Sequence, residues 1–176
     1  MTASDRPSRR PMRAREIVLL GLLGAVLFVS KMALAGLPNI EPVSLLIMVY
    51  MAVLGWRGLF PVYIYVFLEY LIWGVNLWSI CYLYVWLVLA LLARLLRRME
   101  SALGWAVLSG AFGLCFGALC ALTYLVAVGW SYALSWWISG IPFDLAHCAG
   151  NFGMALVLFR PCRKVLARLA GNLARP

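Results

Sequence analysis

The sequence predicts an all-α, polytopic membrane protein with six transmembrane helices and with the N and C termini both in the cytoplasm. Composition is the first observation: 65% of the 176 residues are hydrophobic and only 12% are charged, and the mean hydropathy is +0.96. A soluble domain of this size needs more polar surface than these residues supply. Long apolar runs and the placement of the basic residues are the other two observations.

Basic residues stay on the cytoplasmic side of a membrane when they flank hydrophobic spans. All Lys and Arg residues except Lys31 fall in four clusters, within residues 6–15, at Arg57, within 94–98 and within 160–175. An even number of crossings must separate clusters that lie on the same side. Two crossings between each neighbouring pair of clusters give six helices.

The predicted helices are the apolar runs between these clusters. The first covers residues 17–35 and ends before a turn at 37–42. A Gly-Trp-Arg-Gly turn around Arg57 separates the second helix, 43–54, from the third, 59–73. The fourth helix covers 77–96, and it begins after a turn that contains Asn76.

The fifth helix covers residues 103–128 and the sixth covers 141–159. A helix needs about 20 apolar residues to cross the hydrocarbon core, so the short second or third helix is either broken or begins inside a headgroup layer. The loops are brief. We therefore expect one transmembrane domain, 17–160, between a basic, disordered cytoplasmic tail, 1–16, and a basic cytoplasmic tail, 161–176.

The first helix has a second interpretation. A basic N-terminal stretch, an apolar run and the sequence Ala33-Leu34-Ala35 resemble a secretory signal with its cleavage site. Lys31 argues against this interpretation because a signal core is purely apolar. Cleavage would also leave five spans and break the charge pattern.

The sequence excludes several other classes. The charge of +9 comes from the flanks of the spans, which suits anionic lipid better than nucleic acid. No Walker A motif is present, so the chain does not hydrolyse ATP itself. We expect no cofactor and no metal, because one His with dispersed carboxylates and five unpaired-looking cysteines is a weak metal signal.

The ionisable groups within the spans collect on the external side. Asp144, His147 and Asn151 are spaced i, i+3, i+7 and so share one helical face. That face points inward, since lipid would leave all three groups unpaired. It forms either a hydrogen-bond network between helices, with Lys31 neutralising Glu69 or Asp144, or part of a ligand site.

Aromatic residues around this face favour the ligand site. Tyr82 and Trp86 extend too far into the fourth helix to belong to an interfacial belt. Flat aromatic walls with a few charged contacts suit a heterocyclic, zwitterionic or weakly charged molecule. The predicted ligand-binding residues are Glu41, Glu69, Tyr82, Trp86, Asp144, His147 and Asn151.

Small residues mark two helix-packing surfaces. Gly113 and Gly117 form a GxxxG pair in the fifth helix, which we expect to serve packing within the chain. Gly21 and Ala25 form a similar pair in the first helix.

Four stretches are the basis of a family resemblance: residues 37–44 (LPNIEPVS), 82–86 (YLYVW), 140–147 (GIPFDLAH) and 150–152 (GNF). Through them the chain resembles, over nearly its whole length, the substrate-binding S components of energy-coupling factor (ECF) transporters. This resemblance implies a prokaryotic cell-membrane protein that takes a vitamin-like molecule from outside. It also implies partners, a transmembrane T protein and two ATPase subunits.

The resemblance assigns roles to two further segments. The turn 37–42 matches a lid, and Gly21 and Ala25 match an Ala-x-x-x-Ala pattern that contacts the T protein. Gly21 departs from that pattern, although it keeps the small size. Two other classes remain open: a membrane enzyme that acts on a lipid with Asp144 and His147 as an acid–base pair, and an assembly subunit without a ligand.

Overall fold

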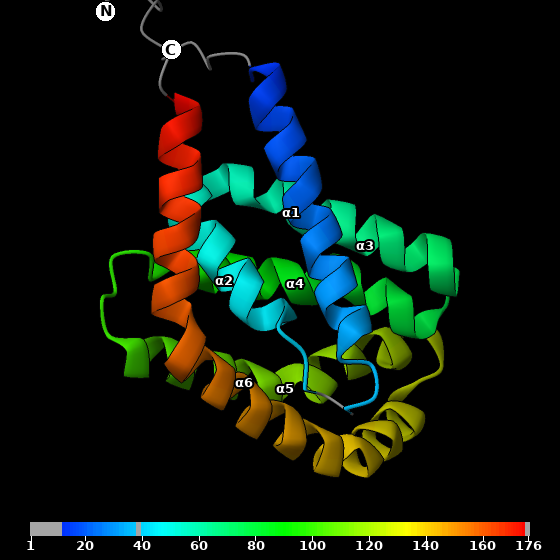
Figure 1. Cartoon of the computed structure of the whole chain (residues 1–176). Coiled ribbons are helices and arrows are strands. Elements are labelled where there is room, and N and C mark those ends of the chain that lie inside the picture. The colour runs from blue at the N-terminus through cyan, green and yellow to red at the C-terminus, as the bar shows by residue number, and fades with distance from the viewer. Residues whose placement is uncertain (1–11, 38–39, 175–176) are drawn as a thin grey trace, which may run out of the picture.

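A computed structural model describes residues 12–37 and 40–174, and in this part of the chain all regular secondary structure is helical, without a strand (Figure 1). The elements are α1 (Ala14–Ala33), α2 (Val43–Leu54), the 3₁₀ helix η1 (Gly55–Gly58), α3 (Leu59–Trp73), α4 (Leu77–Leu95), α5 (Ala102–Ala127) and α6 (Trp130–Ala174). The predicted all-α class is confirmed.

Five helical stretches are long and apolar enough to cross a membrane, which supports a multi-pass membrane protein. They are α1, the continuous run Val43–Trp73, α4, α5 and most of α6. The bounds predicted for α2 and α3 are those observed. The predicted start of α4 is also the observed one, and its predicted end and both predicted ends of α5 differ from the observed ends by one residue. α1 begins at Ala14 rather than at residue 17, so the last residues of the predicted N-terminal tail are part of the helix. Residues 1–11 of that tail lie outside the described part of the chain.

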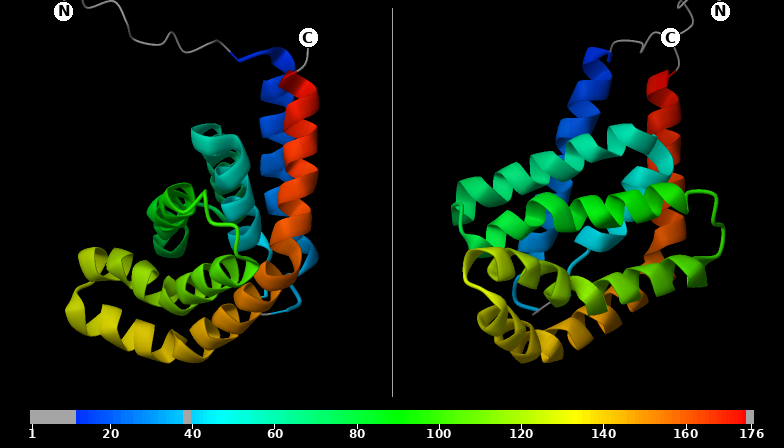
Figure 2. Two further views of the ribbon diagram at one scale, coloured as in Figure 1. Left: turned by 90° about the vertical axis from the view of Figure 1, so that its left-hand side faces the viewer. Right: turned by 180° about the vertical axis from the view of Figure 1, so that it is seen from behind.

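The prediction for the sixth helix was wrong at both ends. α6 begins at Trp130 and continues to Ala174, so it includes Pro142, Pro161 and most of the expected C-terminal tail, 161–176. A proline within a helix removes one backbone hydrogen bond and bends the axis without always ending the helix. The helix indeed bends near its middle (Figures 1 and 2).

α2 occupies the centre of the fold. Its side chains from Val43 to Met51 are almost all buried, and it packs against α4 and α6. The Tyr50 hydroxyl donates a hydrogen bond to the carbonyl of Leu23 (3.1 Å), which ties α2 to α1. Because neighbouring helices cover α2, its 12 residues need not match the bilayer thickness.

Glycines hold α5 and α6 together. A Cβ on Gly113 would lie 2.8 Å from the backbone of His147, and one on Gly117 would collide with the Asp144 carboxylate. Only glycine permits this approach, so the GxxxG pair does serve packing within the chain. α5 and the first half of α6 form one layer of the fold, below α3 and α4 in Figure 2, and the second half of α6 rises away from this layer.

Contacts join the segments that carry the basic clusters. Arg57 lies 2.8 Å from Glu16, which stands in the first turn of α1. The Arg94 guanidinium lies over the Trp56 ring (5.7 Å). Arg160 donates to the carbonyl of Glu100 (3.2 Å). η1 and the α4–α5 loop consequently share one end of the fold, and the α3–α4 turn lies at the other (Figure 1).

Candidate functional site

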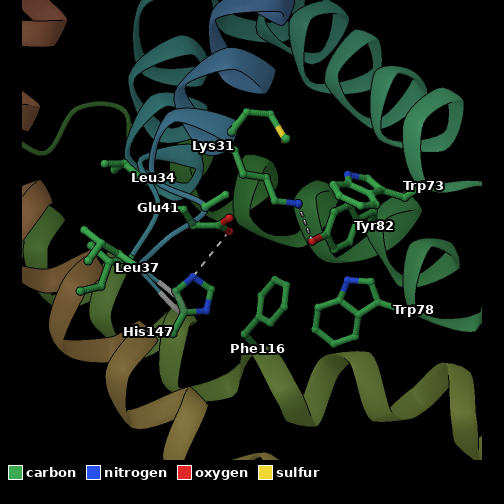
Figure 3. A pocket seen from close by; sticks show the side chains of 12 residues that line it. Lys31, Leu34, Leu37, Glu41, Trp73, Trp78, Tyr82, Phe116 and His147 are labelled. Atoms are coloured by element: carbon green, nitrogen blue, oxygen red, sulfur yellow. Dashed lines mark hydrogen bonds and ion pairs between the residues drawn. The ribbon is translucent and has the colours of Figure 1, made fainter.

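A cavity of about 290 Å³ lies at the end of the fold remote from these contacts (Figure 3). The last turn of α1 and the segment after it cover one side, and α3, α4, α5 and α6 each contribute to the rest. The lining residues are Lys31, Met32, Leu34, Ala35, Leu37, Ile40, Glu41, Trp73, Trp78, Tyr82, Phe116 and His147.

A second cavity of about 340 Å³ adjoins the first. The two share Lys31, Trp73, Trp78 and Tyr82, and the second adds Glu69, Asn76 and Ser79. We call the two together the aromatic cavity.

Lys31 is the cation of the aromatic cavity. Its Nζ lies 2.7 Å from Oε2 of Glu69 and 3.2 Å from the Tyr82 hydroxyl. The ammonium also lies 5.0 Å from the centre of the Tyr82 ring. The side chains of Lys31 and Glu69 are 21% and 5% exposed. Two opposite charges that are held this close to each other neutralise one another inside the fold.

Glu41 and His147 form the second polar pair. Oε1 of Glu41 lies 3.9 Å from Nε2 of His147, which is longer than a hydrogen bond. His147 is almost completely buried, and its Nε2 has no hydrogen-bond partner within the described residues. The second oxygen of Glu69, Oε1, is also buried and has no hydrogen-bond partner among the described residues. These two atoms therefore have bonding capacity to offer a ligand.

Burial raises the pKa of Glu41, which lies between α1 and α2. The charge of Lys31 opposes this rise, and the charge of Glu69 adds to it. The carboxylate lacks enough compensation for its desolvation. Glu41 is thus a buried carboxylate that a nearby cation would stabilise.

Aromatic rings form the remaining wall. Trp78 packs against Phe116 (centroids 6.0 Å apart) and against Tyr82 (6.2 Å). The Phe116 ring meets the His147 ring edge to face at 4.9 Å. Trp86 lies behind this wall, 5.4 Å from both Tyr82 and Phe116. Trp78 is the more accessible ring of this wall, since it is 40% exposed, whereas Phe116 is only 6% exposed and is largely covered by neighbouring rings.

The start of α4 positions two of these rings. The Asn76 side chain accepts a hydrogen bond from the Ser79 amide (3.0 Å), and the Ser79 hydroxyl accepts one from the Asn76 amide (2.8 Å). This reciprocal capping fixes the first turn of α4. Trp78 lies in that turn and Tyr82 follows one turn later on the same face.

The predicted binding residues divide into two groups. Glu41, Tyr82 and His147 line the first cavity, and Glu69 lines the second. Trp86, Asp144 and Asn151 line neither. Their prediction as lining residues is not supported by the geometry.

Asp144 and Asn151 join helices instead. Asp144 accepts a hydrogen bond from the Gly117 amide (2.9 Å). Asn151 donates to the Ser44 hydroxyl (3.1 Å) and to the Ser109 carbonyl (3.4 Å). The predicted inward face of α6 is confirmed, because all three of its residues are buried. Two of them, Asp144 and Asn151, hold α6 against α5 and α2.

Nine residues that line the first cavity were absent from the predicted set, and four of these nine are charged or aromatic: Lys31, Trp73, Trp78 and Phe116. The sequence could have indicated Lys31, because a lone cation within a predicted span requires a partner inside the protein. Nothing in the sequence indicates Phe116 as a lining residue, since an aromatic residue beside a GxxxG pair is typical of ordinary helix packing.

Gly21 and Ala25 lie on a partly exposed face of α1. A Cβ on Gly21 would meet no atom within 4 Å, whereas Gly24 packs tightly against Ile64 of α3. Within this chain, the close contact of α1 therefore uses Gly24, and the predicted partner-binding pair remains uncovered.

Comparison with protein-family models, with curated proteins and with solved structures finds no match to this chain. Within the described residues, no three His, Cys, Asp or Glu side chains are grouped so that they could hold a metal ion. The geometry of the aromatic cavity thus carries the functional argument.

Proposed function

We propose that this chain is the substrate-binding subunit of an ECF-type importer in a prokaryotic cell membrane, and that the aromatic cavity holds its vitamin-like substrate. The observation that carries the proposal is the cavity itself, which combines aromatic walls, an internal ion pair and two buried unpaired polar atoms. Small-molecule sites have this mixture of apolar walls and few polar groups.

The proposed topology has six crossings, with both termini and all basic clusters in the cytoplasm. Each of the contacts Glu16–Arg57, Trp56–Arg94 and Glu100–Arg160 joins segments that this topology places on the same side. Lys31 lies in the last turn of α1, at the opposite end from Glu16. The cavity then opens toward the outside.

The chain requires energising partners in this proposal, since it has no ATP-binding motif. These are a transmembrane T protein and two ATPase subunits. Gly21 and Ala25 on the uncovered face of α1 provide a place where a partner helix can approach closely.

Purification of the tagged protein from its native membrane tests the proposal. We expect it to bring down a transmembrane protein, ATPase subunits and a tightly bound small molecule that mass spectrometry detects. Recovery of the chain alone with lipid turnover would favour the enzyme alternative. Recovery of proteins without a small molecule would favour the assembly subunit.

Cysteine labelling from the two sides of the membrane tests the topology. In a background without native cysteines, cysteines that replace Glu41 and Arg97 should label from opposite sides. Labelling from the same side contradicts six crossings.

A further inference from the structure

We infer that the ligand of the aromatic cavity is a ring-bearing organic cation, which places its positive charge against Glu41 and the free oxygen of Glu69 and its ring against Trp78 and Phe116. This inference rests on the proposed function and names the chemical class of the substrate.

The charge balance of the cavity is the first argument. Two carboxylates, Glu41 and Glu69, face one ammonium, Lys31. Lys31 is already paired with Glu69 at 2.7 Å, so one negative charge remains when Glu41 is ionised and His147 is neutral. A cationic ligand removes this excess, whereas an anionic ligand increases it.

Unused bonding positions are the second argument. Within the described residues, the ion-pair partner of Glu41 is His147, at a distance of 3.9 Å. A ligand nitrogen that carries two or more hydrogens and lies beside Glu41 and His147 would donate one hydrogen to the carboxylate and another to the buried Nε2 when that nitrogen is an acceptor. Oε1 of Glu69 is a further buried acceptor without a partner. An ammonium or amidinium ligand supplies donors for these acceptors.

The aromatic walls are the third argument. Cations bind favourably over aromatic faces because the ring quadrupole is negative there. The fold already uses this property, since the ammonium of Lys31 lies 5.0 Å from the Tyr82 ring centre and 5.9 Å from that of Tyr65. The Trp78 ring lines the same cavity and is 40% exposed, and the largely buried Phe116 ring lines the cavity beside it. They suit the ring and the charge of an incoming ligand.

The size of the cavity limits the ligand. The inferred ligand reaches both cavities, because Glu41 lines the first, of about 290 Å³, and Glu69 lines the second, of about 340 Å³. Both volumes lie near the lower end of the range for small-molecule sites, which suits one or two rings with a short charged substituent better than a large macrocycle.

Three probes of the same planar shape separate charge from shape: benzamidinium is a cation, benzamide is neutral and benzoate is an anion. Binding to the full chain in nanodiscs is measured at neutral pH by tryptophan fluorescence. We expect benzamidinium to bind at least tenfold more tightly than benzamide, and benzoate to bind most weakly. Trp73 and Trp78 in the cavity wall report the binding.

Glu41→Gln should weaken benzamidinium binding roughly ten- to a hundredfold, because a charge-assisted hydrogen bond is lost, and should leave benzamide binding within about twofold. Glu41→Asp should retain the preference for the cation, which guards against a variant that fails to fold. Glu100→Gln is the matched control, since this carboxylate lies in the α4–α5 loop and does not line the cavity.

Equal or tighter binding of benzamide or benzoate overturns the inferred class, and it leaves the proposed function intact because a ligand still binds. Absence of binding by all three probes also overturns the class. The proposed function is then decided separately by the partners and the small molecule that copurify with the chain.

Discussion

The ammonium of Lys31 in the last turn of α1 lies 2.7 Å from the carboxylate of Glu69 near the end of α3. This pair fixes the end of α1 against α3 beside the aromatic cavity. It also accounts for the lone cation within a predicted span, because a charge at this depth is stable only with a partner.

Breaking this pair should destabilise the fold. Lys31→Met leaves Glu69 buried without its cation, and we expect a loss of about 3 kcal/mol of unfolding free energy, at the low end for a buried pair because Lys31 is partly exposed. The double variant Lys31→Met/Glu69→Gln should lose much less than the sum of the two single variants. Reversible unfolding in mixed micelles measures both. Additive losses would show that the two residues are not coupled.

The α5–α6 contact predicts a difference between two glycines. Gly113→Ala places a methyl group 2.8 Å from the His147 backbone, and such overpacking costs about 1–3 kcal/mol. Gly153→Ala in α6 is the control, because its new methyl group meets nothing within 4 Å. The control should be neutral or slightly stabilising, since alanine favours a helix. Equal stability of the two variants, in the same unfolding assay, would contradict the observed packing.

The helix bounds show what the sequence predicts well. Pro42, Gly55 and Gly74 stand at the ends of α2 and α3, and the predicted bounds of these helices are the observed ones. Pro142 was instead taken to lie at a helix start. α6 continues through it because the packing of α6 against α5 outweighs one missing backbone hydrogen bond.

The candidate site was predicted only in part. Helical spacing correctly placed Asp144, His147 and Asn151 on one inward face. Spacing does not reveal which atoms lie opposite each residue. Gly117 approaches Asp144 and Ser44 approaches Asn151, so only His147 is left to face the cavity.

The raised pKa of Glu41 predicts how binding depends on pH. Cation affinity should be complete above the pKa of Glu41, where the carboxylate is ionised, and should fall as the pH decreases through it. Because burial raises this pKa above 4.5, the fall begins at a higher pH than for an exposed glutamate. The charged and titratable groups that face Glu41 are Lys31, Tyr65, Glu69, Tyr82 and His147.

Titration of benzamidinium affinity against pH measures this dependence. Glu41→Gln should remove the component that Glu41 causes, and any remaining change then belongs to the neighbouring groups. An unchanged profile in Glu41→Gln would show that Glu41 does not control binding.

The uncovered face of α1 predicts a separation between coupling and binding. Ala25→Trp should abolish uptake and loosen the association with the T protein, since a large side chain keeps helices apart. Ligand affinity should remain near that of the wild type, because Ala25 does not line the cavity. Val26→Trp, at an exposed position on a different face of the same helix, is the matched control for bulk and should leave uptake near the wild-type level. Uptake at the wild-type level in Ala25→Trp would exclude this face as the docking surface.

The central claim, that the aromatic cavity holds the substrate, is tested most directly by the small molecule that remains bound after purification. Mass spectrometry should detect it with the wild type and show a strong loss in Trp78→Leu and in His147→Ala, which change the cavity wall. Asn151→Ala should lower thermal stability but keep the molecule, because Asn151 bonds to Ser44 and Ser109 outside the cavity. Full retention by folded Trp78→Leu and His147→Ala, with loss in folded Asn151→Ala, would contradict the account.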